Sequence, residues 1–469
     1  MELWAITPEL AIAIGFLLLL LAASFLQRWP AAVYVIAVIV LGIGTALTWR
    51  MSGWSSFPVF HGTYAVDRFA LFFKLYAAAA AILTLFPLSE YLRRQKFRAD
   101  APALVMIATL GSAMLAASID LVLVILFFYL IAASTIILVA LLKVDDRSNE
   151  AALKYFVYSA GATAVLLFGL SFMYGLAGTT SIDAAAQSWG FALPILGFGL
   201  AIVGFGFEMA AAPFHMWAPD VYEGAPTPIS GFISVLPKAA MIAVTLRVVT
   251  GVLAPAETAW RPLIEVMAVL SMTAGNIWAL RQNNLKRLLA YSSIAQIGYV
   301  LIGVAVSGTP EGGQSALFYL LTYLFMNLGA FFVVARLEQS LGGAEIESYY
   351  GLFTRSPVLA VAFSLLLLSL AGVPPLAGYL GKVLVLTAAI HAHAAWLAVI
   401  ASANFVLAMY YYLRVIAAMF LHEPSETTTP IQASPATDFA IALAVLGSLV
   451  LGIFPGPFLA WVQSSSAHL

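Results

Sequence analysis

Three ionisable side chains, Glu208, Lys238 and Lys382, lie inside long apolar runs of the sequence, each within about two helical turns of a proline. A charge in hydrocarbon is expensive, so an ionisable group that is kept there is a candidate for function. A lysine and a glutamate that are held away from water can both change protonation near neutral pH. A series of such groups, with water between them, would form a path for protons.

These side chains also have a structural interpretation. Glu208 and Lys238 could neutralise each other across adjacent helices as a static ion pair. Lys74 and Arg247 lie nearer the ends of their apolar runs, so we expect their long stems to carry the charge to the membrane surface. His215, two residues after Pro213, could pass protons between the aqueous face and the interior, and a structural role is an equal alternative.

The composition indicates the environment of these groups. Of the 469 residues, 63% are hydrophobic and 9% are charged, and the mean hydropathy is +0.99. A soluble domain of this kind would expose a mostly apolar surface, so the sequence indicates a membrane protein. The chain has no cysteine, which excludes disulfides and thiolate-bound iron–sulfur clusters within it, and we expect no cofactor or metal in this chain. The formal net charge of −1 argues against nucleic acid as a partner.

Apolar runs of bilayer-spanning length recur along the chain, which we interpret as one integral membrane domain over residues 1–469. The fold class is all-α and polytopic, with about fourteen transmembrane helices. We place helices 1–3 in 1–100, helices 4–8 in 101–254, helices 9–13 in 262–421 and helix 14 at 437–462.

Basic residues are distributed unevenly between the two sides of this arrangement. One side holds Arg28, Arg93, Arg94, Lys96, Arg98, Lys143, Arg147, Lys154, Arg281, Lys286, Arg287, Arg336, Arg355 and Arg414. The other side holds only Arg50, Arg68 and Arg261. Because basic loops stay in the cytoplasm, we predict that both termini are periplasmic and that the membrane is a bacterial inner membrane.

Proline interrupts two of the spans in a similar way, at Pro213 and at Pro374 with Pro375. Proline removes a backbone donor and clashes with the preceding turn, so the helices should break there. Broken helices at corresponding positions of two halves indicate a transport path, although a single proline kink is common in membrane helices. Each half, 101–254 and 262–421, would contain five spans, and since five is odd the second repeat would be inverted.

The polar segment 211–228, AAPFHMWAPDVYEGAPTP, resembles the signature of the antiporter-like, proton-translocating membrane subunits of complex I, the respiratory NADH:quinone oxidoreductase. Its DVYEGAPTP form is more similar to the N chain (mitochondrial subunit 2) than to the L or M chains. Segments 150–156, 286–299 and 370–378 match the same family, so the resemblance covers essentially the whole chain.

The resemblance implies that this chain translocates protons while other subunits transfer electrons from NADH to quinone. NAD, FMN, iron–sulfur clusters and quinone are then expected on those other subunits. The implied partners are the neighbouring antiporter-like and small membrane subunits of complex I, together with the lipid bilayer. The chain would count as part of an enzyme without holding a redox centre of its own.

Residue by residue, the family's lysines of spans 8, 12 and 6 match Lys238, Lys382 and Lys154. Two positions depart from the pattern. The usual span-7 lysine is Glu208 here, and the span-5 glutamate that usually pairs with it is replaced by Tyr129. We expect Tyr129 to donate a hydrogen bond to Glu208, which would be the titrating group of the first half. The competing hypothesis is a divergent paralogue with impaired pumping.

Two other functions fit parts of the sequence. Subunits of Mrp-type cation/proton antiporters and of membrane-bound hydrogenases share this architecture, and the DVYEGAPTP form favours the quinone-linked type over both. A bundle that only anchors partner subunits belongs to a different class. Buried Lys238 and Lys382 argue against it, because a scaffold has no reason to keep charge in the membrane.

Overall fold

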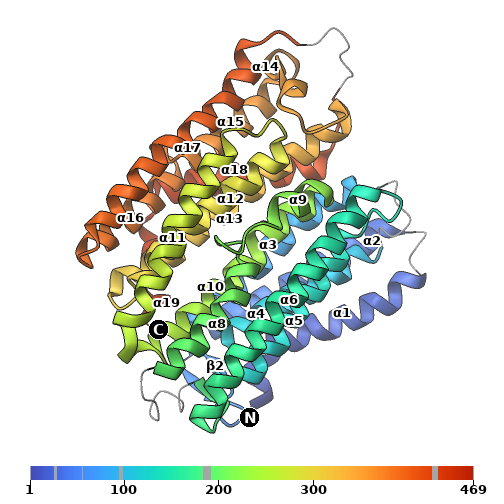
Figure 1. Cartoon of the computed structure of the whole chain (residues 1–469). Helices are drawn as coiled ribbons and strands as arrows, with labels where there is room; N and C mark the ends of the chain where they lie inside the picture. The colour runs from blue at the N-terminus through green and yellow to red at the C-terminus, as the bar shows by residue number, and fades with distance from the viewer. Residues whose placement is uncertain are drawn as a thin grey trace.

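The computed structural model describes residues 2–25, 29–54, 56–93, 99–182, 192–424 and 431–467. Arg28, Arg94, Lys96 and Arg98, which contributed to the predicted orientation, lie outside these ranges. Within them the chain is an elongated bundle of helices that run roughly side by side (Figure 1).

The first part of the bundle is built from the N-terminal residues up to the end of the predicted first repeat. Its elements are η1 (Glu2–Ile6), α1 (Thr7–Phe25), α2 (Pro30–Arg50), η3 (Met51–Gly53), β1 (Phe57–Val59), β2 (Tyr64–Val66), α3 (Arg68–Tyr91), α4 (Ala101–Ala117), α5 (Leu121–Val139), α6 (Asp146–Ala177), α8 (Ala192–Glu208), α9 (Ala218–Gly224) and α10 (Thr227–Thr250). β1 and β2 form an antiparallel hairpin in which Phe57 pairs with Val66.

The second part contains the predicted second repeat and the C-terminal helices. Its elements are η4 (Ala254–Ala256), α11 (Glu257–Ala279), α12 (Leu285–Ala305), α13 (Pro310–Leu341), η5 (Ile346–Tyr349), α14 (Leu352–Arg355), α15 (Pro357–Ala371), α16 (Ala377–His391), α17 (Ala395–Leu421), α18 (Pro435–Ile453) and α19 (Gly456–Ser466).

Eleven helices of the described part are long and apolar enough to cross a membrane, and α4, α15, α16 and a part of α8 are shorter apolar helices. The prediction of an all-α polytopic membrane protein is therefore confirmed. The number fourteen and the inverted relation of the two repeats stay predictions.

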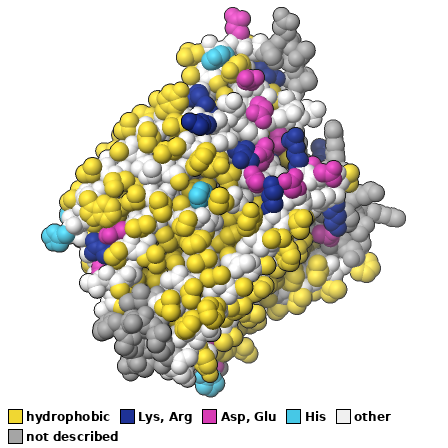
Figure 2. Space-filling model, in the orientation of Figure 1, with side chains coloured by type: hydrophobic (Ala, Val, Ile, Leu, Met, Phe, Trp, Pro, Cys, Tyr) yellow, Lys and Arg dark blue, Asp and Glu magenta, His cyan; other side chains and the backbone are white. Residues whose placement is uncertain are grey.

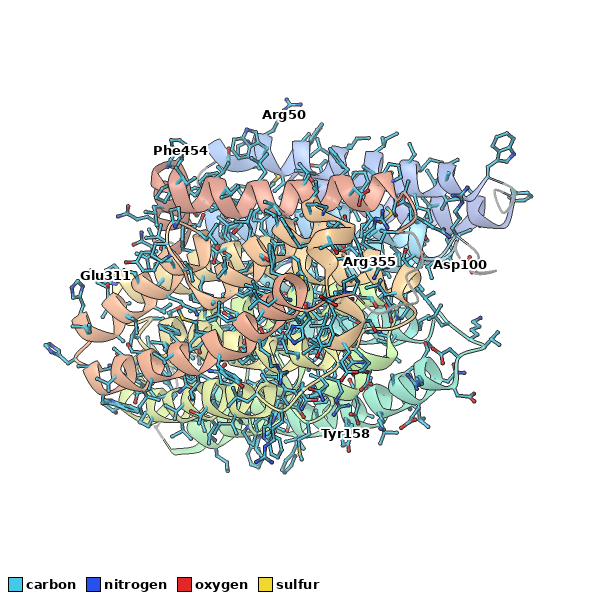
Figure 3. The ribbon with its side chains drawn as sticks, turned by 90° about the horizontal axis from the view of Figure 1, so that it is seen from above. Arg50, Asp100, Tyr158, Glu311, Arg355 and Phe454 are labelled. Atoms are coloured by element: carbon cyan, nitrogen blue, oxygen red, sulfur yellow. The ribbon has the colours of Figure 1, made fainter. Side chains whose placement is uncertain are left out.

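The helices differ greatly in how much of their surface is covered by protein. α10 is buried along its whole length, and α12 and α13 are almost as enclosed, whereas α1, α2 and α18 expose most of their surface. Figure 2 shows the resulting broad apolar face, with charged side chains gathered toward one end of it. Seen from above, Arg50 and Tyr158 lie at opposite edges of the bundle (Figure 3). A bilayer is the solvent that suits such a surface.

Side-chain caps start several of these helices. The Asp67 carboxylate accepts from the Ala70 amide at 2.7 Å at the start of α3, and Asp120 does the same for Val122 at 2.8 Å at the start of α5. Each cap satisfies an amide that would otherwise lack a partner in the first helical turn. Asn284 caps α12 in the same way.

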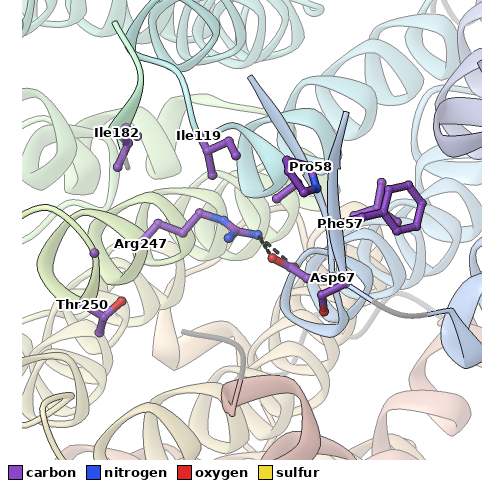
Figure 4. A pocket seen from close by; sticks show the side chains of 11 residues that line it. Phe57, Pro58, Asp67, Ile119, Ile182, Arg247 and Thr250 are labelled. Carbon is purple, nitrogen blue, oxygen red and sulfur yellow. Dashed lines mark hydrogen bonds and ion pairs between the residues drawn. The ribbon is translucent and has the colours of Figure 1, made fainter. Parts of the chain in front are cut away.

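Lys74 and Arg247 do not reach the surface as we expected, and this prediction is wrong. Nζ of Lys74 is buried 2.6 Å from Oε1 of Glu9, and Tyr64 donates to the same oxygen at 2.8 Å. Arg247 makes two 3.0 Å hydrogen bonds to the carboxylate of Asp67 beside a cavity of about 260 Å³ (Figure 4). Both cations stay inside because each has a carboxylate partner on a neighbouring element.

Candidate functional site

The first helix break follows α8, as the position of Pro213 predicted. α8 ends at Glu208, and Ala210 adopts a left-handed backbone conformation with φ of +54° before the chain reaches α9. The Trp217 indole then packs back and donates to the carbonyl oxygen of Phe207 at 2.9 Å. The Ser271 hydroxyl accepts the amide of Ala212 at 2.8 Å. Backbone groups that the break frees thus find partners inside the protein, as they must at membrane depth.

Glu208 is completely buried at this break. Its Oε1 accepts a 2.8 Å hydrogen bond from the hydroxyl of Tyr155 on α6, and its Oε2 has no hydrogen-bond partner among the described residues. The ring of Tyr155 stacks on Trp217 with 4.5 Å between centroids, which holds the hydroxyl in place. A carboxyl group with one free, enclosed oxygen is suited to binding and releasing a proton.

The predicted donor Tyr129 does not contact Glu208, so this part of the sequence interpretation is corrected. The Tyr129 side chain is 50% exposed and shares the outer stripe of α5 with Val122 and Leu126. α6 packs directly against α8, and Tyr155 on α6 provides the hydroxyl instead.

Lys238 is completely buried in the middle of α10. Its Nζ donates to the hydroxyl and the carbonyl oxygen of Ser293 on α12, at 2.6 and 3.3 Å. No ion pair joins it to Glu208 in the described part of the chain, so the structural alternative of a static pair is not formed there. Lys238 is held by neutral oxygen atoms, and a change in its charge would not break an ion pair.

A second group of hydroxyl and amide side chains begins at Ser292, next to Ser293 in the sequence, and lies toward the second half. The hydroxyls of Ser292 and Tyr412 lie 2.5 Å apart. Gln296 donates to Tyr412 at 3.2 Å and to the carbonyl oxygen of Leu370 at 3.2 Å, and it accepts from Tyr319 at 2.5 Å. The group ends beside Ala371, the last residue of α15.

The second break separates α15 from α16, as Pro374 and Pro375 predicted. Gly372 turns the chain with φ of +85°, a conformation that favours glycine. Lys382 on α16 is buried and donates to the carbonyl oxygen of Ala371 at 2.8 Å. Its Nζ also lies 4.4 Å from the ring centroid of Phe405. The ammonium therefore lies at the carbonyl end of a broken helix, where a positive charge is favoured.

Lys154 lies at the edge of this site, and His215 follows the first break. Lys154 is partly exposed and contacts Glu150 and Asp220 at 2.7 and 2.9 Å. Arg287 approaches the same Asp220 at 2.7 Å. Burial alone would raise the pKa of Asp220, but the hydrogen bonds from Lys154 and Arg287 hold it below its ordinary value. Nδ1 of His215 is buried without a hydrogen-bond partner in the described part of the chain.

The sequence interpretation missed the polar side chains between the charged ones. They are Tyr155, Ser292, Ser293, Gln296, Tyr319, Tyr323 and Tyr412. A signal was present, because Ser293 and Gln296 are three residues apart on α12 and Tyr319 and Tyr323 are four apart on α13. Such spacings place polar groups on one face of an otherwise apolar helix.

No group of three or more His, Asp or Glu side chains that could hold a metal ion occurs in the described ranges. The fold and the site have two interrupted helices, with Glu208 and Lys382 buried at the breaks and Lys238 buried on α10. They place the molecule in the class of antiporter-like, ion-translocating membrane proteins.

Comparison with known proteins is consistent with this class. Residues 118–408 match the family model described as "NADH:quinone oxidoreductase/Mrp antiporter, TM". The chain therefore belongs to this family. NADH-quinone oxidoreductase subunit N 1 of Solibacter usitatus is 37% identical over 98% of this chain and 96% of its own length. NADH-quinone oxidoreductase subunit N 2 of Rhizobium meliloti is 38% identical over 99% of this chain and 98% of its own length.

Solved structures have the same architecture. A chain of respiratory complex I from Thermus thermophilus superposes with a TM-score of 0.84 at 33% identity, over 98% of this chain and 100% of that one. A chain of the Mrp complex from Dietzia superposes with a TM-score of 0.89 at 20% identity, over 100% of this chain and 98% of that one. The second likeness concerns the fold alone.

Proposed function

We propose that this chain is the N-type membrane subunit of a bacterial NADH:quinone oxidoreductase and translocates protons while other subunits carry electrons from NADH to quinone. The observation that carries the proposal is the buried Lys238, which is bound by the Ser293 hydroxyl and by no carboxylate in the described part of the chain. A scaffold would gain nothing from such a group, whereas a proton relay requires it.

In the proposed path, Glu208 is the titrating group of the first half and Lys382 is that of the second half. Lys238 lies between them and can pass charge in either direction. Tyr155 takes over the role that we assigned to Tyr129, because it holds the carboxylate of Glu208. The hydroxyls around Ser293 and Gln296 provide donors and acceptors between Lys238 and Lys382. Each step moves a proton between oxygen or nitrogen atoms and breaks no other bond.

His215 and Lys154 belong to the loop side of the same path in this proposal. His215 follows the first break and has a free ring nitrogen within the described residues, which suits a group that exchanges protons with water. Lys154 precedes Tyr155 on α6 and ties that helix to the loop at Asp220. Its role is to position Tyr155 and not to carry the proton through the membrane.

The remaining components belong to other subunits in this proposal. NAD, FMN, iron–sulfur clusters and quinone would be bound there, and the neighbouring antiporter-like and small membrane subunits would contact the exposed apolar faces. Both termini would lie on the periplasmic side of the inner membrane, with the basic loops in the cytoplasm.

An Mrp-type cation/proton antiporter subunit is the second candidate, and the TM-score of 0.89 to a chain of the Dietzia Mrp complex is the observation in its favour. The identity of that chain is only 20%, whereas the relatives named subunit N reach 37–38% over nearly the whole chain. We therefore prefer the quinone-linked function.

The test is the proton-to-electron ratio of the purified complex in proteoliposomes, measured for Glu208→Gln and Lys238→Met. We expect electron transfer to persist in both and the ratio to fall, because the path through this subunit is interrupted. Arg50→Gln is the control, since Arg50 is exposed at the edge of the bundle (Figure 3). Unchanged ratios in both variants would exclude the proposed path.

A further inference from the structure

A large polar cavity lies where α3, α13 and the start of α18 meet, at the end of the bundle where α10 begins. Its volume is about 740 Å³, and its lining includes Glu90, Tyr91, Arg336 and Gln339. Most of the lining residues carry polar side chains, so the cavity suits water. None of the groups in the path proposed above lines it.

One carboxylate, Glu90, lines this cavity, and a second, Glu338, is bonded to a residue that lines it. Glu90 accepts from the Thr437 amide at 2.9 Å and from the Thr437 hydroxyl at 2.7 Å, and it also accepts from Ser434. It therefore caps the start of α18 and is fully engaged. Glu338 accepts from Tyr91, a lining residue, at 3.4 Å, and on the inner side it accepts from the Thr227 hydroxyl. Glu338 thus connects the cavity with the first residue of α10.

Lys286 lies on the same inner side as Thr227. Its Nζ is buried, 3.9 Å from Oε1 of Glu338 and 2.7 Å from the carbonyl oxygen of Ala225. The side chain of Glu338 is 23% exposed, so it is largely shielded from water on the side that faces Lys286. Glu338 therefore lies between Tyr91 on the cavity side and Lys286 and Thr227 on the inner side.

Polar side chains continue inward along the contact between α10 and α13, which pack against each other. Asn327 on α13 donates to the hydroxyl of Ser234 on α10 at 2.6 Å. Tyr323 donates to the carbonyl oxygen of Ser234 at 3.2 Å, and its hydroxyl lies 2.6 Å from that of Ser293. Ser293 is the residue that binds Lys238.

Thr227 and Ser234 are about 10 Å apart along α10, the rise of seven helical residues. The hydroxyl of Ser230 lies between them, but it donates to the carbonyl oxygen of Tyr222 at 2.7 Å and so does not join them. Gly231 and Phe331 face each other there, and a Cβ added to Gly231 would come within 3.0 Å of Cβ of Phe331. The Phe331 ring also packs edge-on to Tyr222, whose ring lies 5.9 Å from Nζ of Lys238. Phe331 therefore packs against α10 in the stretch between Thr227 and Ser234, next to the ring that contacts Lys238.

The inner side contains an unsatisfied polar atom. Oδ1 of Asn327 is completely buried and has no hydrogen-bond partner among the described residues. Buried amide oxygens nearly always have a partner, and a water molecule is the usual one when protein provides none. This atom lies beyond Phe331, where a proton carrier from the cavity would arrive.

We propose that the cavity bordered by α3, α13 and α18 is the proton inlet to Lys238, with Glu338 as its first acceptor and Phe331 as its gate. The inference rests on the proposed function. A proton from cavity water binds to a carboxylate oxygen of Glu338 and neutralises it. When Phe331 moves aside, water joins Thr227 to Ser234 and Asn327, and the proton passes through Tyr323 and Ser293 to Lys238. Glu338 is left ionised for the next proton.

The first experiment compares Glu338→Gln with Glu90→Gln in proteoliposomes that contain the whole complex. Glu90 lines the cavity and Glu338 is bonded to the lining residue Tyr91, but only Glu338 connects inward. We expect Glu338→Gln to lower the proton-to-electron ratio as far as Lys238→Met does, with electron transfer retained, and Glu90→Gln to keep the wild-type ratio. If Glu338→Gln pumps like the wild type while Lys238→Met does not, the inlet is elsewhere and the proposed function stands. If neither variant lowers the ratio, the proposed function itself fails.

A second experiment does not depend on pumping and uses the absence of cysteine from the chain. A charged methanethiosulfonate is added to the loop side of membrane vesicles that contain the complex with Ser234→Cys, and the label on this subunit is measured. We expect Phe331→Ala to raise the labelling rate of Ser234→Cys by about tenfold, because it opens the gate. Thr245→Cys, which is equally buried on α10, is the control, and Phe331→Ala should not change its labelling rate. Equal rates at both positions in the Phe331→Ala background would overturn the inlet.

Gly231→Ala provides a variant that leaves every polar group in place. The added methyl fills the space beside Phe331 and should slow proton uptake several-fold. Gly42→Ala is the matched control, because nothing lies within 4 Å of a Cβ at that position of α2. Unchanged uptake in Gly231→Ala would argue against a gate at this contact.

Discussion

The hydroxyl of Tyr155 donates a 2.8 Å hydrogen bond to Oε1 of Glu208, and both side chains are completely inaccessible to solvent. Tyr155 comes from α6 and Glu208 from the end of α8, so the bond joins two helices at the first break. The stacking of Tyr155 on Trp217, whose indole donates to the Phe207 carbonyl, makes the tyrosine, the tryptophan and the break one rigid unit.

Tyr155→Phe should leave the fold intact, since the ring and its stacking remain, while the proton-to-electron ratio falls. Loss of the hydroxyl leaves an enclosed carboxylate oxygen without its donor, at a cost of about 1–3 kcal/mol in stability. Infrared difference spectra should show a shifted carboxyl band that is absent in Glu208→Gln. Tyr129→Phe is the control, because Tyr129 is half exposed on α5. An identical effect of both variants would show that the Tyr155–Glu208 bond has no role.

Gly372→Ala should displace Lys382 as well as destabilise the second break. Gly372 has φ of +85°, and an alanine there costs about 1–2 kcal/mol from its backbone alone. The new Cβ would also meet Cδ of Lys382 at 2.6 Å. Gly342→Ala has a similar φ of +79° but no atom within 4 Å of its Cβ, so it should affect thermal stability alone. Pumping that is equally impaired in both variants would contradict this distinction.

Removal of one partner from the buried pair of Lys74 and Glu9 should destabilise the junction of α1 and α3. Lys74→Met alone leaves an enclosed carboxylate, and the expected loss is about 3–5 kcal/mol. The double variant with Glu9→Gln should recover much of that loss, because no charge is left unpaired. Thermal unfolding of the purified complex, analysed as a double-mutant cycle, measures the coupling. Strictly additive losses would mean that the two charges do not depend on each other.

The network around Asp220 should make stability sensitive to acid. Hydrogen bonds from Lys154 and Arg287 hold the pKa of Asp220 below its ordinary value. The contribution of ionised Asp220 to the free energy of unfolding is therefore fully present at neutral pH. It declines below about pH 4 and is lost as the pH falls through the lowered pKa. Asp220→Asn should therefore reduce the melting temperature at pH 7 and narrow the difference from wild type on acidification. Asp146→Asn, at an exposed position, should show no such convergence.

The prolines, the apolar runs and the mid-run charges were sufficient to predict the membrane fold, both helix breaks and the burial of Glu208, Lys238 and Lys382. Each of these features depends on residues that are close in sequence. The Tyr129 prediction failed because it rested on alignment with the family, which does not show that α6 rather than α5 packs against α8. The prediction for Lys74 failed because its partner Glu9 is distant in sequence and is brought to it only by the packing of α1 against the rest of the bundle.

The predicted proton roles of Glu208, Lys238, Lys382, His215 and Lys154 stay predictions. The connecting side chains were missed because serine, glutamine and tyrosine are common in membrane helices. Only the meeting of α10, α12, α13 and α17 brings them into two hydrogen-bonded sets, one around Ser293 and one around Tyr412.

α10 is enclosed by protein from Thr227 to Val249, so none of these residues faces lipid in the finished molecule. The ribosome completes this helix before it makes α12 and α13, which provide Ser293 and Asn327 to its polar side chains. Lys238 therefore waits without its hydroxyl partner until 55 further residues have been added. Membrane insertion of the first half is thus unfinished until the second half has been translated, and the insertion machinery has to shelter a charged helix in the meantime.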